Sequence, residues 1–165
     1  MLSARQGKGA KTAVMKEKSV CVTGHRVLPG DFSRSELNRM LRACAEEGYL
    51  CFYVGMALGF DLICFEELLK LKEHYPIRII ACIPCADQAE RFTAAQKRQY
   101  RSLYEKADET VVLHERYEEG CMQERNRYMV DRSERVIAYL RHVGGGTYYT
   151  VRYAVEQGKE IVYLK

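Results

Sequence analysis

Two glycine-rich segments of the chain have the composition of turns that hold a phosphate group. The first is Gly144-Gly145-Gly146-Thr147, which follows an apolar run. The second contains Gly55, Gly59 and Asp61 at the start of an amphipathic stretch. Glycine permits positive φ and a close approach of backbone to ligand, and a helix starting there presents unpaired N–H groups and a positive dipole end. Both segments predict a backbone cradle for phosphate, in which Asp61 would accept from a ribose hydroxyl or hold the loop.

Each segment also has a purely structural interpretation. Three glycines can form a flexible turn with Thr147 as N-cap, and Asp61 can be an acid that the helix dipole favours in the first turn. The first segment is not a P-loop, because it lacks the Gly-Lys-Ser/Thr ending. The dinucleotide fingerprint does not follow the first apolar run either. The sequence alone leaves both interpretations open.

Charged side chains in two other segments could contact an anion. His25-Arg26 follows the first apolar run, and the planar fork of Arg26 suits phosphate, whereas a histidine at such a position is more often a hydrogen-bonded structural residue. Glu124-Arg125-Asn126 falls in the first turn of a predicted helix, from which Arg125 could point toward a ligand.

Short apolar runs alternate with longer amphipathic stretches along the chain. Runs rich in Val and Ile predict strands at 19–23, 51–54, 77–83, 110–113, 135–140 and 160–164. Helices are predicted between them: one capped by Ser33, one beginning near Leu58, and three at 92–107, 121–132 and 147–157. The alternation predicts an α/β fold, a single Rossmann-like, doubly wound, mainly parallel sheet of about six strands with helices on both faces.

The segments with unusual residues all follow predicted strands, and Pro84 to Gln88 after the third strand joins them. In a parallel sheet these loops share the carboxyl edge, where such folds bind ligands. This convergence of loops is the main reason to expect a ligand site there.

The charge of the chain is concentrated near its start. The formal net charge is +4, and residues 1–18 alone contain five Lys and Arg residues and one acid. Residues 19–165 therefore hold 21 basic and 21 acidic side chains. We predict a basic disordered tail or a non-native extension at 1–18 and one domain at 19–165. The neutral balance of that domain argues against a nucleic-acid partner.

The sequence has no apolar stretch approaching about 18 residues and no apolar signal core, so we expect a cytoplasmic protein without a membrane span. Its seven cysteines are an odd number and are expected to be reduced thiols. Cys82-Ile83-Pro84-Cys85 is similar to a thiol–disulfide motif, but Cys82 falls inside a predicted strand and should be buried. The cysteines and histidines show no paired zinc spacing, so we expect no metal.

Taken in order, these residues resemble the SLOG superfamily, a Rossmann-like group that includes DNA-processing protein A and the lonely-guy phosphoribohydrolases. Within it, the chain looks most like the YpsA-type branch, from about Ser19 to Lys165. The resemblance rests on the order and spacing of the following segments. They are Thr23-Gly24-His25-Arg26, Gly55-x-Ala57-x-Gly59-x-Asp61, Pro84 with Gln88, Arg125-Asn126-x-x-Met129-Val130, and Gly144-Gly145-Gly146-Thr147 with Tyr153-Ala154 and Gly158-Lys159.

The resemblance implies binding of nucleotides or nucleotide-derived molecules. Lonely-guy enzymes cleave the N-glycosidic bond of nucleoside monophosphates with an Arg in Met-x-x-Arg-Lys and a Glu in Gly-Gly-x-Gly-Thr-x-x-Glu. Met122-x-x-Arg125 matches the first segment with Asn126 in place of Lys, whereas in the second Val143 replaces a Gly and Thr150 stands at the Glu position. Because this cleavage needs a carboxylate, Thr150 argues against it, and Glu124 or Asp61 would have to substitute.

We therefore expect the protein to bind or sense a nucleotide or a nucleotide-derived phosphorylated ligand, such as an ADP-ribose-like molecule, without a required cofactor. Two alternatives stay open. One is an N-glycosidase or phosphoribohydrolase with Arg125, Glu124 and Asp61 as catalytic candidates, and the other is a single-stranded DNA-binding module. The tyrosines of 148–153 also suggest a homo-oligomer contact. The predicted ligand-binding residues are Thr23, Gly24, His25, Arg26, Gly55, Ala57, Gly59, Asp61, Pro84, Gln88, Arg125, Asn126, Gly144, Gly145, Gly146 and Thr147.

Overall fold

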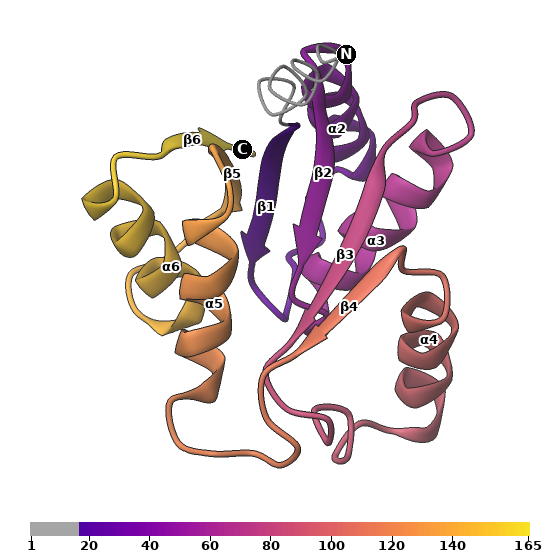
Figure 1. Cartoon of the computed structure of the whole chain (residues 1–165), viewed down its shortest axis with the longest axis vertical. Helices are drawn as coiled ribbons and strands as arrows, with labels where there is room; N and C mark the ends of the chain where they lie inside the picture. Colours follow the sequence, from indigo (N-terminus) through magenta and orange to yellow (C-terminus); the bar gives the residue numbers. More distant parts are fainter. Residues whose placement is uncertain (1–16) are drawn as a thin grey trace, which may run out of the picture.

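A computed structural model describes residues 17–165, in which strands and helices alternate (Figure 1). Residues 1–16 of the predicted tail lie outside the described residues. Lys18, the last residue of that predicted tail, belongs to the first strand. In chain order the elements are β1 (Lys18–Gly24), α2 (Arg34–Glu46), β2 (Tyr49–Val54), α3 (Phe60–Leu71), β3 (Arg78–Ile83), α4 (Ala94–Tyr104), β4 (Glu109–Val112), α5 (Cys121–Asp131), β5 (Arg135–Tyr139), α6 (Gly145–Glu156) and β6 (Glu160–Tyr163).

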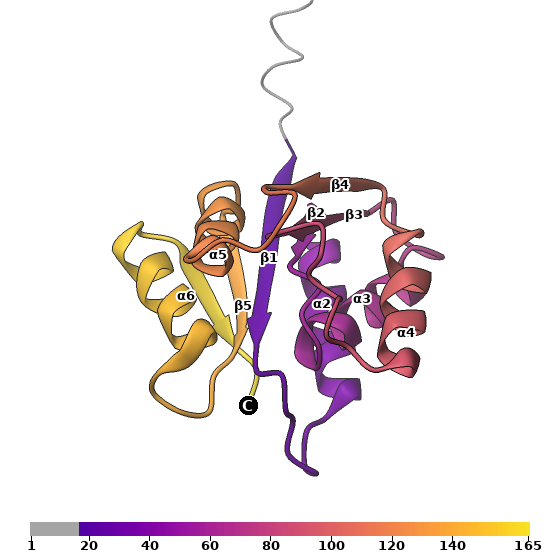
Figure 2. The same ribbon diagram turned by 90° about the horizontal axis from the view of Figure 1, so that it is seen from below.

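The strands form one six-stranded sheet in the order β4-β3-β2-β1-β5-β6, and every neighbouring pair is parallel. The chain runs outward from β1 to β4 and then returns to start the other half at β5. Helices α2, α3 and α4 lie on one face of the sheet, and α5 and α6 lie on the other (Figure 2). The predicted Rossmann-like, doubly wound fold is therefore confirmed.

The order of the strands reverses between β1 and β5. Because β1 pairs with β2 on one side and with β5 on the other, the loops after β1 and β5 leave in opposite directions. Such a switch point opens a crevice beyond the carboxyl ends of the two strands. The fold thus provides a binding position next to Gly24 and Tyr139, which pair in the last register of β1 and β5.

The helices begin in two different ways. Ser33 caps α2 by accepting a hydrogen bond from the Glu36 amide at 3.1 Å, and Thr93 caps α4 in a reciprocal capping box with Gln96. Helices α3, α5 and α6 instead have the N-cap glycines Gly59, Gly120 and Gly144, which make no side-chain cap bond. The first-turn N–H groups of these three helices therefore have no side-chain oxygen of an N-cap residue to accept from them.

The core has two parts, one on each face of the sheet. The larger part joins β1, β2 and β3 to α2 and α3 through fully buried residues such as Val22, Phe52 and Phe65. The smaller part lies under α5 and α6 and includes Met129, Val136 and Ala154. Among residues 17–165, no helix is long and apolar enough to cross a membrane.

Candidate functional site

A cavity of about 370 Å³ lies at the carboxyl ends of β1 and β5, where the strand order reverses. We call it the switch-point cavity. It is lined by the end of β1 with the loop that follows, by the start of α3, by the start of α5 and by the start of α6. Its lining residues are Val22, Thr23, Gly24, His25, Arg26, Ala57, Asp61, Met122, Gln123, Arg125, Asn126, Met129, Gly146 and Thr147.

Three helix N-termini meet at this cavity. Asp61 comes from the first turn of α3, Met122 and Gln123 from the first turn of α5, and Gly146 and Thr147 from the first turn of α6. These are the helices with glycine N-caps, so their positive dipole ends share this space. The first amides of α3 and α5, those of Phe60 and Cys121, already donate to the carbonyls of His25 and Glu118, so the later first-turn N–H groups are the ones left for a ligand. This arrangement favours a negatively charged group in the cavity.

The start of α6 departs from the predicted turn. The helix begins at Gly145, two residues before the predicted 147, and its N-cap is Gly144 instead of Thr147. Gly144 and Gly145 have φ of 93° and 85°, which other residues rarely adopt. The buried Thr147 lies in the cavity wall, whereas the N-cap Gly144 and the first helical residue Gly145 are not among the residues that line the cavity.

Asp61 supplies a carboxylate to the switch-point cavity. Its side chain is 6% exposed, and Oδ2 accepts a hydrogen bond from the Ala57 amide at 3.1 Å. Burial raises the pKa of Asp61 to about 6, while Arg125 and the Ala57 amide act in the opposite direction. The preceding residue of the loop, Met56, is fully buried with φ of 64°, a conformation that positions the Ala57 amide.

Arg125 lies in the floor of the cavity and ties α5 to two strands. Its guanidinium Nη1 donates to the carbonyl oxygens of Gly55 and Cys82, the latter at 3.1 Å, and Nε donates to Asn126 Oδ1 at 2.9 Å. The side chain is 4% exposed, and burial lowers the pKa of Arg125. Arg125 thus adds positive charge beneath the cavity, but its donors are mostly engaged by the protein.

The loop after β1 is held by contacts to its neighbours. His25 Nε2 accepts a hydrogen bond from the Arg141 amide at 2.9 Å, and its ring stacks on His142 with 4.0 Å between centroids. Burial, His142 and Arg141 lower the pKa of His25, so the neutral ring is favoured as acceptor. His25 therefore joins the loops after β1 and β5, as its structural interpretation predicts, and Arg26 is left as the exposed cation of the loop.

Gly59 is required where this loop meets the start of α3. Its φ is 82°, and a Cβ atom there would lie 2.1 Å from the carbonyl oxygen of Arg26. The next amide, that of Phe60, donates to the carbonyl of His25 at 3.1 Å. The loops after β1 and β2 are thereby packed against each other, which places Arg26 and Ala57 on one wall.

Other predicted residues lie outside the switch-point cavity. Glu124 is exposed, and its Oε1 pairs with His114 Nε2 at 2.7 Å. Thr150 is fully buried and donates its hydroxyl to the Gly146 carbonyl at 2.8 Å. Pro84 is buried beside β3. Gln88 is engaged on both ends, donating to the Gly55 carbonyl and accepting from the Tyr100 hydroxyl.

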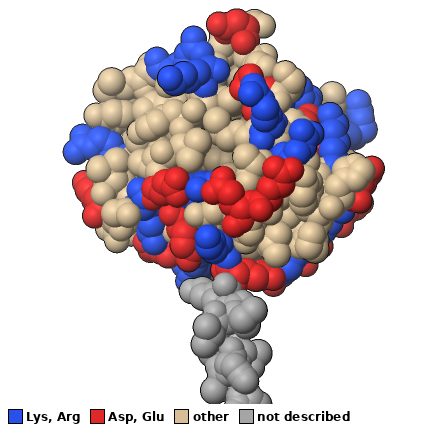
Figure 3. Space-filling view, turned by 90° about the horizontal axis from the view of Figure 1, so that it is seen from above, with Lys and Arg blue, Asp and Glu red and all other residues tan. Residues whose placement is uncertain are grey.

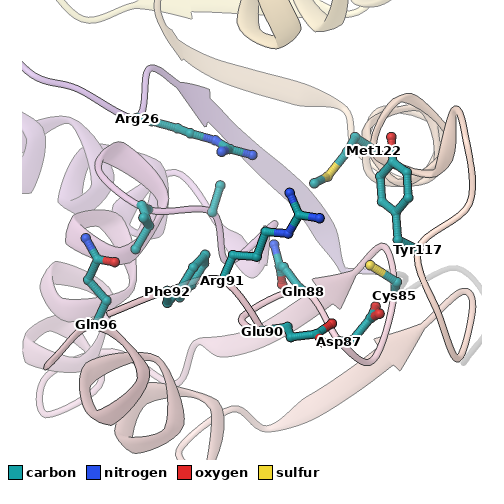
Figure 4. Close-up of a pocket in the computed structure, with 12 residues that line it drawn as sticks. Arg26, Cys85, Asp87, Gln88, Glu90, Arg91, Phe92, Gln96, Tyr117 and Met122 are labelled. Atoms are coloured by element: carbon teal, nitrogen blue, oxygen red, sulfur yellow. The ribbon is translucent and has the colours of Figure 1, made fainter. Parts of the chain in front are cut away.

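A second cavity, of about 620 Å³, lies over the loops after β2, β3 and β4 (Figure 4). We call it the loop cavity. It shares Arg26, Ala57 and Met122 with the switch-point cavity, so the two are adjacent. Its other lining residues are Leu58, Cys85, Asp87, Gln88, Glu90, Arg91, Phe92, Gln96 and Tyr117. The sequence pattern does not identify Arg91, Phe92 or Tyr117 as site residues. The sequence feature that could have pointed to them is their position in the segments that follow β3 and β4, at the carboxyl edge of the sheet.

The thiols of the chain are free and buried. Cys82 lies inside β3 at 1% exposure, and Cys85 is 2% exposed. Burial raises the pKa of each of these two thiols to about 12, which opposes the thiolate that exchange chemistry requires. Among the described residues 17–165, no group of three or more His, Cys, Asp or Glu side chains could hold a metal ion.

The parallel sheet and its switch-point cavity define a Rossmann-like α/β protein of the SLOG type. The chain belongs to the YspA SLOG family, whose model (YpsA) matches residues 31–163. A UPF0398 protein of Bacillus pumilus is 28% identical over 110 residues, covering 65% of this chain and 59% of that relative. The uncharacterized SPbeta prophage-derived protein YoqJ of Bacillus subtilis is 30% identical over 116 residues, covering 62% and 68%.

Solved structures with the same fold include two DNA processing proteins A. That of Streptococcus pneumoniae has a TM-score of 0.67 at 18% identity, and the match covers 90% of this chain and 50% of that one. That of Helicobacter pylori, studied for its single-stranded DNA binding mode, also has a TM-score of 0.67, at 21% identity, covering 90% and 66%. This chain therefore spans about half to two thirds of the length of these proteins, and the likeness shows a shared fold.

Proposed function

We propose that the protein binds a nucleotide or nucleotide-derived ligand by its phosphate group in the switch-point cavity. The observation that carries this proposal is the meeting of three helix N-termini with glycine N-caps at one cavity of about 370 Å³. Free N–H groups and dipole ends suit a phosphate, and the exposed Arg26 offers a charge-assisted partner. A volume of about 370 Å³ lies within the range of small-molecule sites, which supports the proposal.

Substitutions at Gly146 test the phosphate position directly. A Cβ atom there would have only Asn126 Nδ2 within 4 Å, at 3.9 Å, so alanine fits and the first side-chain atom of aspartate meets no clash. Gly146→Asp places a carboxylate at the start of α6, where it stabilises the helix but repels a bound phosphate. We expect it to weaken binding of AMP and ADP-ribose at least about tenfold, a change of about 1.4 kcal/mol, while Gly146→Ala stays within about threefold.

Isothermal titration calorimetry with AMP, ADP-ribose and inorganic phosphate measures these affinities. Arg26→Ala should weaken binding by about tenfold through loss of its charge-assisted hydrogen bonds, and Arg98→Ala on the exposed face of α4 serves as the matched control. The proposal fails if the unmodified protein binds none of the phosphorylated compounds. Equal affinities of Gly146→Asp and Gly146→Ala would also refute it.

Single-stranded DNA is the second candidate, because one protein of the same fold is described as binding it. The charge balance of the domain offers less support for that ligand, because residues 19–165 hold 21 basic and 21 acidic side chains. On the face shown in Figure 3, Lys and Arg side chains are interspersed with Asp and Glu, without a continuous basic track. Fluorescence anisotropy with a labelled oligonucleotide distinguishes the candidates, because backbone contacts to DNA weaken steeply with salt. Tight, salt-sensitive oligonucleotide binding that survives Gly146→Asp would favour DNA.

Hydrolysis of an N-glycosidic bond is a weaker candidate. Thr150 uses its hydroxyl inside α6, and Glu124 is paired with His114 away from the cavity lining. Asp61 is therefore the carboxylate that remains for such chemistry in the switch-point cavity. Release of free base from nucleoside monophosphates, abolished in Asp61→Asn, would support this candidate.

A further inference from the structure

The two cavities adjoin but differ in chemistry. The switch-point cavity is lined by small residues, helix starts and Asp61, and its described lining includes no Phe, Tyr or Trp. The loop cavity is larger and contains the aromatic rings of Phe92 and Tyr117. A ligand that crosses from one to the other passes Arg26, Ala57 and Met122, the residues that both cavities share.

The walls of the loop cavity suit a planar ring. Phe92 is held by an edge-to-face contact with Tyr100, with 5.7 Å between ring centroids. Tyr117 is 60% exposed, so its ring is accessible to a ligand in the loop cavity. Figure 4 shows Phe92 and Tyr117 on opposite sides of the Arg91 side chain, with Met122 beside Tyr117. Flat aromatic ligands stack on such side chains.

Polar groups in the same cavity can meet the edge of a base. The guanidinium groups of Arg26 and Arg91 both point toward the middle of the cavity (Figure 4). The Gln96 Oε1 atom accepts from the Thr93 amide at 2.9 Å, which leaves the Gln96 NH₂ group as a donor at the rim. Gln88 contributes only shape, because both ends of its amide are bonded to the protein.

We infer that the loop cavity is the recognition site for the base of a nucleoside phosphate whose phosphate lies in the switch-point cavity. The inference rests on the proposed function and adds the position and the stacking partners of the base. Tyr117 provides the stacking face, Leu58 and Met122 the apolar walls, and Arg91 and Gln96 the polar edge. The ribose then lies at the junction beside Arg26 and Ala57.

The test compares ligands with and without a base. Titrations use ribose 5-phosphate, the four common nucleoside monophosphates and ADP, with the full chain and with Tyr117→Ala. We expect the tightest nucleoside monophosphate to bind about tenfold more strongly than ribose 5-phosphate. A tenfold gain corresponds to about 1.4 kcal/mol, which is within the range that one stacked base contributes. In Tyr117→Ala this gain is lost, and the affinity for ribose 5-phosphate is unchanged. Tyr163→Ala on β6, exposed and outside both cavities, is the matched control.

Three outcomes would overturn the inference while leaving the proposed function intact. In the first, ribose 5-phosphate binds as tightly as every nucleoside monophosphate. In the second, Tyr117→Ala weakens ribose 5-phosphate and the nucleotides equally. In the third, ADP binds more tightly than ribose 5-phosphate but the nucleoside monophosphates do not, and Arg91→Ala removes the advantage of ADP. This result would place a second phosphate, not a base, between Arg26 and Arg91. Failure of the proposed function is distinct, because then ribose 5-phosphate does not bind at all.

Discussion

At the scale of single residues, Asp61 is a carboxylate in a cavity whose other groups favour an anion. Its raised pKa of about 6 has burial as the main cause, and Arg125 reduces that shift without removing it. A charged Asp61 would repel a phosphate placed at the same helix starts, whereas the protonated form could donate to it. The side chain is thus the residue through which pH acts on the site.

Asp61 should make folding stability depend on pH in a defined direction. Because the folded-state pKa is above the usual 3.8, the folded protein holds the proton more tightly, and this stabilisation is complete below about pH 4. It is lost as the pH rises from about 4 through about 6, by about 3 kcal/mol in all. Asp61→Asn lacks this loss, and part of it has already occurred at pH 4, so the stability of the variant relative to the unmodified protein should rise by about 2 kcal/mol between pH 4 and pH 7.

Urea unfolding of the two proteins at pH 4 and pH 7, in phosphate-free buffers, measures this difference. Other titrating groups contribute equally to both proteins and cancel. An unchanged difference between the two pH values would show that Asp61 does not titrate in this range.

At the scale of elements, Arg125 connects α5 to the ends of β2 and β3. Its donors satisfy the carbonyls of Gly55 and Cys82 at the edge of the sheet. Arg125→Ala leaves the Cys82 carbonyl without that donor, whereas the Gly55 carbonyl keeps the bond from Gln88. One buried unsatisfied group costs about 1–3 kcal/mol, so we expect a loss of about 2 kcal/mol in the free energy of unfolding.

Chemical denaturation measures this loss, with Arg132→Ala as control. Arg132 is the exposed C-cap residue of the same helix, and its guanidinium lies 3.6 Å from the centroid of the Tyr128 ring, so its substitution should change stability by about 1 kcal/mol or less. Arg125→Lys keeps the charge but not the fork, and should recover only part of the loss. If Arg125→Ala is as stable as the unmodified protein, the hydrogen bonds from Arg125 to the ends of β2 and β3 do not stabilise the fold.

The elements themselves follow closely from the sequence. The six strands are present within two residues of their predicted bounds. The four central strands are buried, and buried parallel strands are continuous apolar runs, whereas the edge strands β4 and β6 are more exposed and are marked by their Val and Ile residues. The start of α6 differs, since two glycines at positive φ complete the turn before Gly146. Which loops share the carboxyl edge also follows from the alternation of strands and helices.

Side-chain contacts at the site do not follow from the sequence. Glu124 and Arg125 are neighbours in the first turn of α5, yet one is exposed and the other is 4% exposed. The i, i+4, i+8 spacing of Cys121, Arg125 and Met129 places Arg125 on the buried face of α5. The hydrogen-bond partners of Arg125 depend on the packing of α5 over β3, which the sequence does not show. His25 likewise meets the Arg141 amide only because β1 and β5 are adjacent. The homo-oligomer contact suggested for the tyrosines of 148–153 is not needed to explain two of them. Tyr149 accepts a hydrogen bond from Arg127 of α5, and Tyr153 donates one to Asp131 of the same helix.

At the scale of the whole molecule, the cysteines report on the integrity of both parts of the core. Cys44 and Cys64 lie in the larger part, and Cys21, Cys51 and Cys82 lie in the smaller one. None of the seven is more than 4% exposed. Their reaction with a thiol reagent therefore requires that the fold opens.

We expect a thiol reagent at neutral pH to modify almost none of the seven cysteines in the native protein and all seven in urea. The loss of native thiol protection should follow the unfolding curve, because burial and not local charge keeps these groups unreactive. Cys85 is the sharpest case, since it borders the loop cavity while burial raises its pKa to about 12. Rapid native modification of Cys82 or Cys85, located by mass spectrometry, would contradict this account and would restore thiol exchange as a candidate activity.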